Sequence, residues 1–79
     1  MADEAAHRNR LREAILRHLR AHPFAADTAE GIVSNWLVGF ADARAYIDGV
    51  LEDMTQKSML RAYRLPGGRV LYKKGAAAR

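Results

Sequence analysis

Two histidines four residues apart, His18 and His22, are the first side chains in this sequence that could do chemistry. At this spacing both lie on one face of a helix, and two such imidazoles can begin a divalent-metal site. No third ligand follows at a suitable spacing, and no glutamate stands next to His18 as in a zinc-protease helix. We therefore interpret the pair as one partly buried and one exposed histidine at a helix end, and we expect no metal.

Nucleophilic catalysis would need a serine, threonine or lysine beside a base. Ser34 and Ser58 have no histidine or acid at a telling spacing. A solvated helix face explains the acids Asp48, Glu52 and Asp53. We therefore expect no catalytic residue, no cofactor and no small-molecule substrate, and hence a protein that is not an enzyme.

Basic and aromatic side chains gather in the last third of the chain, where no acid follows Asp53. Guanidinium and ammonium groups pair with phosphates, and an exposed tyrosine can stack on a base. Strand alternation would place Arg61 with Tyr63 on one face and Arg64 on the other. The alternative is a hairpin edge that its charges keep soluble. The candidate nucleic-acid-binding residues are Arg61, Tyr63, Arg64, Arg69, Lys73 and Lys74.

A second candidate surface surrounds the only tryptophan. Trp36 lies at helical spacing from Ile32 and Val33, which favours a core position. If Trp36 and Phe40 were exposed, they would mark a protein interface. The acidic third helix would add charge complementarity toward basic elements. The candidate interface residues are Trp36, Val38, Phe40, Asp48 and Glu52.

The size and composition of the chain point to one small domain. Its 79 residues carry a net charge of +4 and no cysteine, which excludes disulfides and thiolate metal sites. No apolar run reaches the roughly 18 residues of a membrane span, and the acidic start does not resemble a secretory signal. We expect a cytoplasmic protein without a membrane partner, with one domain over residues 1–74 and a flexible tail over 75–79 that buries nothing.

Hydrophobic periodicity predicts two helices in the first half of the chain. The first is expected over residues 5–21, where Pro23 ends it. The second is expected over residues 28–37, with Asp27 as N-cap and Glu30 completing a capping box.

The second half predicts a third helix and a hairpin. Asp42 is expected to cap a helix over residues 42–57, whose inner stripe is Ala43, Ile47, Val50, Leu51 and Met54. Two strands, Leu60–Leu65 and Arg69–Lys73, should flank the turn Pro66-Gly67-Gly68, which is a hairpin tip and not a phosphate loop.

This order of elements resembles the winged helix-turn-helix superfamily over about residues 8–74. The most specific stretch is Ile47, Leu51 and Met54 followed by Met59-Leu60 entering the hairpin. The segment from Ala21 to Ile32 is also similar to short uncharacterised bacterial proteins, a likeness that implies no activity. The resemblance implies an α+β fold with a two-stranded wing and a short first strand near residues 24–26, in which Phe24 takes the place of the family's first-strand residue.

Two features depart from that superfamily. Lys57-Ser58 stands where glycine commonly precedes the wing. DNA-binding members present the third helix to the major groove, but the outward positions expected here are largely acidic: Asp42, Ala45, Asp48, Gly49, Glu52 and Asp53. We therefore expect a non-catalytic binding module that contacts nucleic acid through its basic hairpin and tail. The alternative is a protein-interaction adaptor or a homodimer that uses the surface of helices two and three.

Overall fold

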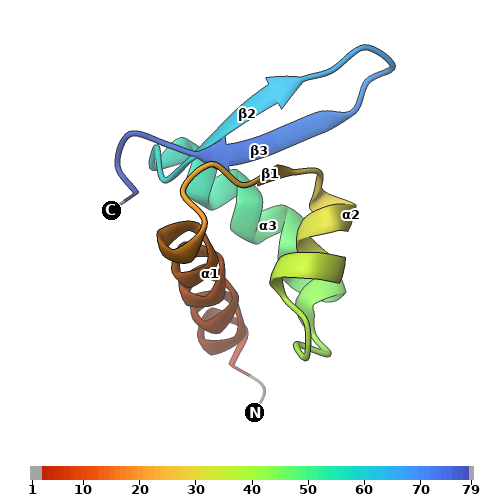
Figure 1. The fold of residues 1–79 in the computed structure, drawn as a ribbon. Helices are drawn as coiled ribbons and strands as arrows, with labels where there is room; N and C mark the ends of the chain where they lie inside the picture. The colour runs from red at the N-terminus through yellow and green to blue at the C-terminus, as the bar shows by residue number, and fades with distance from the viewer. Residues whose placement is uncertain (1–2, 79) are drawn as a thin grey trace.

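The protein folds into three helices on one side of a three-stranded antiparallel sheet, as seen in a computed structural model that describes residues 3–78 (Figure 1). Helix α1 spans Glu4–Ala21, α2 Ala29–Gly31 continues into the π-helical turn η1 Ile32–Trp36, and α3 spans Ala43–Gln56. The strands are β1 Ala26–Asp27, β2 Leu60–Arg64 and β3 Val70–Lys74. The expected α+β class is confirmed, but the sheet has three strands instead of two.

Helix α1 follows its predicted apolar stripe. Asp3 is its N-cap, where the carboxylate accepts a hydrogen bond from the Ala6 amide at 3.3 Å. Leu11, Ile15 and Leu19 are almost fully buried, and the helix ends two residues before Pro23. The predicted span was one residue short at its start.

The second helix differs from its prediction in both its cap and its interior. Thr28, and not Asp27, is the N-cap, and its hydroxyl accepts from the Gly31 amide at 3.2 Å. Gly31 is therefore the third helical residue, and Glu30 completes no capping box. The Leu37 amide then reaches back five residues to the Ile32 carbonyl at 3.0 Å. This wider turn buries Ile32, Trp36 and Leu37 together, which a regular α-helix would spread over a larger arc.

Helix α3 buries its whole predicted inner stripe, from Ala43 to Met54. Asp42 stands at the N-cap position, but its side chain makes no capping bond. Its Oδ2 instead lies 2.5 Å from Nδ1 of His7 and 3.3 Å from the Arg10 guanidinium. The carboxylate expected to cap α3 therefore ties α3 to α1.

The sheet has the order β1-β3-β2, so β3 lies between the other two strands. The hairpin β2–β3 pairs Leu60 with Lys74 and Arg64 with Val70, and Gly67 and Gly68 at its tip take positive φ. The first strand pairs Ala26 with Lys73 and Asp27 with Tyr72. Phe24, which is expected to belong to this first strand, therefore lies before it.

The segment after β3 packs against the start of β2. The Gly75 amide donates to the Met59 carbonyl and the Ala77 amide to the Ser58 carbonyl, both at 2.9 Å. Ala78 is only 6% exposed. The expectation that residues 75–79 bury nothing is therefore wrong for Gly75 and Ala78, whereas Arg79 lies outside the described residues.

Candidate nucleic-acid interface

The register of the hairpin assigns each basic residue of β2 and β3 to one face of the sheet. Directly opposed residues of an antiparallel pair share a face, and successive residues alternate between faces. Leu60 is buried and Tyr72 packs against the hydrophobic core, so these two positions mark the face toward the helices. The opposite side, which we call the outer face, carries Arg61 paired with Lys73 and Tyr63 paired with Leu71. Figure 1 shows no helix on that side.

The outer face brings two cations around one aromatic ring. Nζ of Lys73 lies 5.8 Å from the centroid of the Tyr63 ring, within cation–π range. A hydrogen bond from Arg61, together with the charges of Arg61 and Lys73, lowers the pKa of the Tyr63 hydroxyl. Tyr63 is 40% exposed. The expected grouping of Arg61 with Tyr63 is confirmed, and Lys73 joins them from the neighbouring strand.

The other predicted basic residues lie elsewhere. Arg64 shares the helix-facing side with Val70, although it is exposed near the hairpin tip. Arg69 lines a hollow beside α2 together with Glu30. Lys74 pairs with Leu60, so it faces α1. The six candidate residues therefore do not form one surface.

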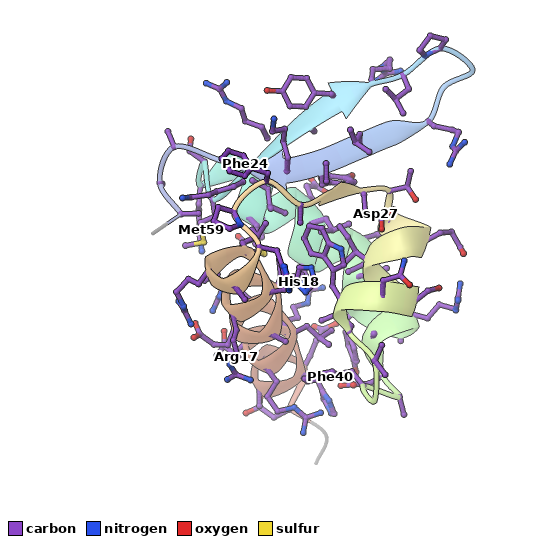
Figure 2. The ribbon with its side chains drawn as sticks, in the orientation of Figure 1. Arg17, His18, Phe24, Asp27, Phe40 and Met59 are labelled. Atoms are coloured by element: carbon purple, nitrogen blue, oxygen red, sulfur yellow. The ribbon has the colours of Figure 1, made fainter. Side chains whose placement is uncertain are left out.

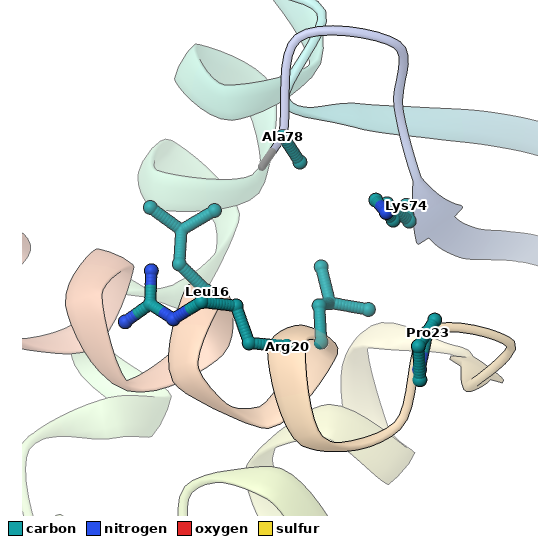
Figure 3. A pocket seen from close by; sticks show the side chains of 6 residues that line it. Leu16, Arg20, Pro23, Lys74 and Ala78 are labelled. Carbon is teal, nitrogen blue, oxygen red and sulfur yellow. The ribbon is translucent and has the colours of Figure 1, made fainter.

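Lys74 lines a pocket of about 360 Å³ at the end of α1 (Figure 3). Leu16, Leu19 and Pro23 form much of its wall, and Ala78 closes the side nearest the C-terminal turn. Arg20 is the second cation that lines it. Lys74 therefore lies on the side of the sheet opposite to the outer face, although Lys73 is the adjacent residue in the chain.

One exposed aromatic residue near the sheet was not among the predicted site residues. Phe24 is 92% exposed, in the turn that the Ala25 amide closes by donating to the His22 carbonyl at 3.0 Å. Ala25 packs against the core, so Phe24 projects to solvent beside the sheet (Figure 2). Its signal in the sequence is an aromatic residue directly after a proline, with no apolar partner at helical spacing.

The exposed face of α3 is narrower than expected but remains acidic. Asp42 contacts His7, Asp53 contacts Arg12 and Lys57, and the Arg8 guanidinium covers Gly49. These three expected outward positions therefore face α1 instead. Ala45, Asp48 and Glu52 are exposed as expected.

The acids that stay exposed on α3 lie toward the helix-facing side of the sheet. Burial raises the pKa of the Tyr72 hydroxyl, and the negative charges of Asp48 and Glu52 raise it further. Because Tyr72 points toward the helices, the negative charge of α3 is directed at the inner face of the hairpin and away from the outer face.

Only part of the candidate protein interface is exposed. Trp36 is 9% exposed and stacks on His18 at 4.6 Å between ring centroids, so its core interpretation is correct. Val38 is 73% exposed, and Phe40 is half-buried against the core. A protein partner would therefore meet Val38 and the edge of Phe40 without the tryptophan as an anchor.

The histidine pair takes part in this aromatic stack. The ring centroids of His18 and His22 are 4.8 Å apart. Burial lowers the pKa of His18, and the charge of His22 lowers it further. Within residues 3–78, no group of three or more potential ligand side chains is placed to hold a metal ion.

Comparisons with family models, curated proteins and solved structures found no match for this chain. Within the part of the chain that the structure describes, no helix is long and apolar enough to cross a membrane.

Proposed function

We propose that this protein is a non-catalytic winged-helix module that binds nucleic acid through the outer face of its sheet. The observation that carries the proposal is the pairing of Arg61 with Lys73 on that face, beside the ring of Tyr63. No acidic residue follows Asp53 in the sequence, so neither strand of the hairpin offsets these charges. The order of helices, short strand and hairpin supports the winged-helix part of the proposal.

Phosphate neutralisation supplies most of the affinity in this proposal. Each phosphate contact by Lys or Arg lowers the logarithm of the binding constant by about 0.7 to 0.9 per tenfold rise in salt. Two contacts, from Arg61 and Lys73, would make binding weaken roughly seven- to twelvefold between about 50 mM and about 200 mM salt. Little sequence preference is expected, because contacts to phosphates carry no base information.

Major-groove reading by α3 is not part of the proposal. The exposed positions Ala45, Asp48 and Glu52 present a methyl group and two carboxylates to any duplex laid against the helix. Carboxylates repel phosphates, and neither Asp48 nor Glu52 forms an ion pair within residues 3–78 that would offset its charge.

The test is a titration of labelled single-stranded and duplex oligonucleotides by fluorescence anisotropy at both salt concentrations. Lys73→Gln should weaken binding and reduce the salt dependence by about one phosphate contact. Lys74→Gln is a matched control, because it removes the same charge from the next residue on the opposite face. Absence of binding at the lower salt, or equal effects of the two variants, would refute the proposal.

The second candidate, a protein adaptor or homodimer, rests on the exposed Val38 and on the negative face of α3 at Asp48 and Glu52. Val38→Ser would then weaken self-association or partner binding and leave oligonucleotide binding unchanged. Light scattering of the wild type that shows only monomer, with no reproducible partner in a pull-down, would count against this candidate.

A further inference from the structure

We propose that the outer face binds single-stranded nucleic acid in preference to duplex, with the Tyr63 ring and the Phe24 ring as stacking platforms on either side of the Arg61–Lys73 pair. This inference rests on the proposed function and specifies its substrate. It predicts that bases, and not only phosphates, contribute to affinity.

The placement of the two aromatic residues supports this arrangement. Tyr63 lies on β2 opposite Leu71, toward the hairpin tip. Phe24 precedes the strand in which Ala26 pairs with Lys73, so it lies across β3 from Tyr63 and toward the opposite end of the sheet. A single nucleic-acid strand that runs across the sheet from the Tyr63 ring to the Phe24 ring would pass over Lys73 and beside Arg61.

The exposure of the rings matters because it has no packing explanation. Phe24 is 92% exposed beside the sheet (Figure 2), and Tyr63 is 40% exposed on the outer face, which the helices leave uncovered. Every base has a π-face, so aromatic residues beside cations bind single strands with little sequence preference. The bases of a duplex are already stacked on each other and cannot lie on these rings.

The charges on this side of the sheet favour a polyanion over a protein partner. Among the described residues 3–78, the only acid on a strand is Asp27, and it lies opposite Tyr72 on the helix-facing side. Its carboxylate accepts from the Thr28 amide at 2.8 Å and from Nδ2 of Asn35 at 3.4 Å, so it is turned toward the second helix. A negatively charged nucleic-acid strand would therefore contact Arg61 and Lys73 with no acidic side chain of the described strands beside them on the outer face.

The experiment compares three labelled probes of about 12 nucleotides: oligothymidylate, an abasic strand of the same length, and a duplex. The abasic strand keeps the phosphates and removes the bases. We expect oligothymidylate to bind at least about fivefold more tightly than the abasic strand or the duplex. This factor corresponds to one stacked base at the lower end of the known stacking contribution. Tyr63→Thr, which keeps a good strand residue, should remove the part of that advantage that comes from the Tyr63 ring and leave the abasic affinity unchanged.

Two further variants keep the test independent of folding. Tyr63→Phe retains the ring and should bind like the wild type. Phe24→Ser changes an exposed turn residue that the fold does not need, and it should weaken oligothymidylate binding and spare the abasic probe. Circular dichroism of each variant confirms that the fold is intact.

The outcomes separate this inference from the proposed function. If all three probes bind equally and with salt dependence, or if the duplex binds best, the preference for single strands is refuted and the proposed function stands. If Tyr63→Thr weakens the abasic and thymidine strands equally, stacking is refuted. If no probe binds at low salt, the proposed function falls as well.

Discussion

The contact between Gly75 and the backbone entering β2 provides the most direct test of this fold. Gly75 follows β3, is buried, and its amide donates to the Met59 carbonyl at 2.9 Å. A Cβ atom at this position would overlap the Ser58 carbonyl oxygen and lie 2.9 Å from the Leu60 amide nitrogen. These neighbours are backbone atoms and cannot move aside by a change of rotamer. Gly75→Ala must therefore push the end of β3 away from the start of β2.

The size of this effect can be worked out from the contacts involved. Separating the two segments breaks the Gly75–Met59 and Ala77–Ser58 hydrogen bonds, each worth about 1 kcal/mol net. Residual overlap adds roughly 1 kcal/mol, whereas the lower entropy of alanine in the unfolded chain returns about 0.5 kcal/mol. We expect a loss of about 2–3 kcal/mol in the free energy of unfolding. For a domain of this size, that loss lowers Tm by roughly 10–20 °C.

Urea denaturation followed by circular dichroism measures this difference, and a thermal scan gives the shift in Tm. Ala76→Ser is the matched control, because it adds one heavy atom to the adjacent exposed residue and should change stability by less than about 0.5 kcal/mol. A Gly75→Ala variant as stable as the wild type would show that the C-terminal turn does not pack against the start of β2, and the reasoning would fail.

Two further predictions concern backbone strain and charge. Ser58 takes φ +61°, a conformation that costs a residue with a Cβ atom about 1 kcal/mol. Ser58→Gly should therefore raise the urea midpoint of unfolding, and a lowered midpoint would contradict this account of the turn. The hydrogen bond from His7, aided by the charge of Arg10, lowers the pKa of Asp42 in the folded protein. Its contribution to stability is therefore present above the unfolded pKa of about 3.9 and is lost as the pH falls through the folded value. Asp42→Asn should lose less stability than the wild type between about pH 6 and about pH 2.5, and equal losses would refute this role.

Local periodicity made helix α3 predictable from the sequence. Ile47, Leu51 and Met54 recur at the spacing of one helical face, and the structure buries all of them. The same reasoning placed Arg61 and Tyr63 on one face of a strand, because alternation in a strand is as local as periodicity in a helix.

The features that the sequence did not predict depend on contacts between distant residues. A short first strand was expected, but its bounds depend on the pairing of Ala26 and Asp27 with β3, more than 40 positions later in the chain. The π-helical turn ends at Trp36, which is buried and stacks on His18, a contact with a distant residue that the local sequence does not show. The Asp42 side chain does not cap α3 but contacts His7, which lies 35 residues earlier in the chain.

The composition of the candidate site was predictable, but its geometry was not. The six candidate residues are near one another in the sequence, but the register of β2 with β3 divides five of them between two faces, and Arg69 lies outside both strands beside α2. Lys73 and Lys74 show this most clearly, because adjacent lysines point to opposite sides of the sheet. Phe24 could not be assigned to the site until the pairing of Ala26 with Lys73 placed it beside the sheet.

The separation of charge across the sheet explains how one small domain carries an acidic helix and a basic hairpin without mutual cancellation. The carboxylates of Asp48 and Glu52 act on Tyr72, which lies on their own side of the sheet. The cations Arg61 and Lys73 act on Tyr63, on the other side. Because the two groups lie on opposite faces, a polyanion that approaches the outer face comes closer to the cations of the hairpin than to the carboxylates of α3.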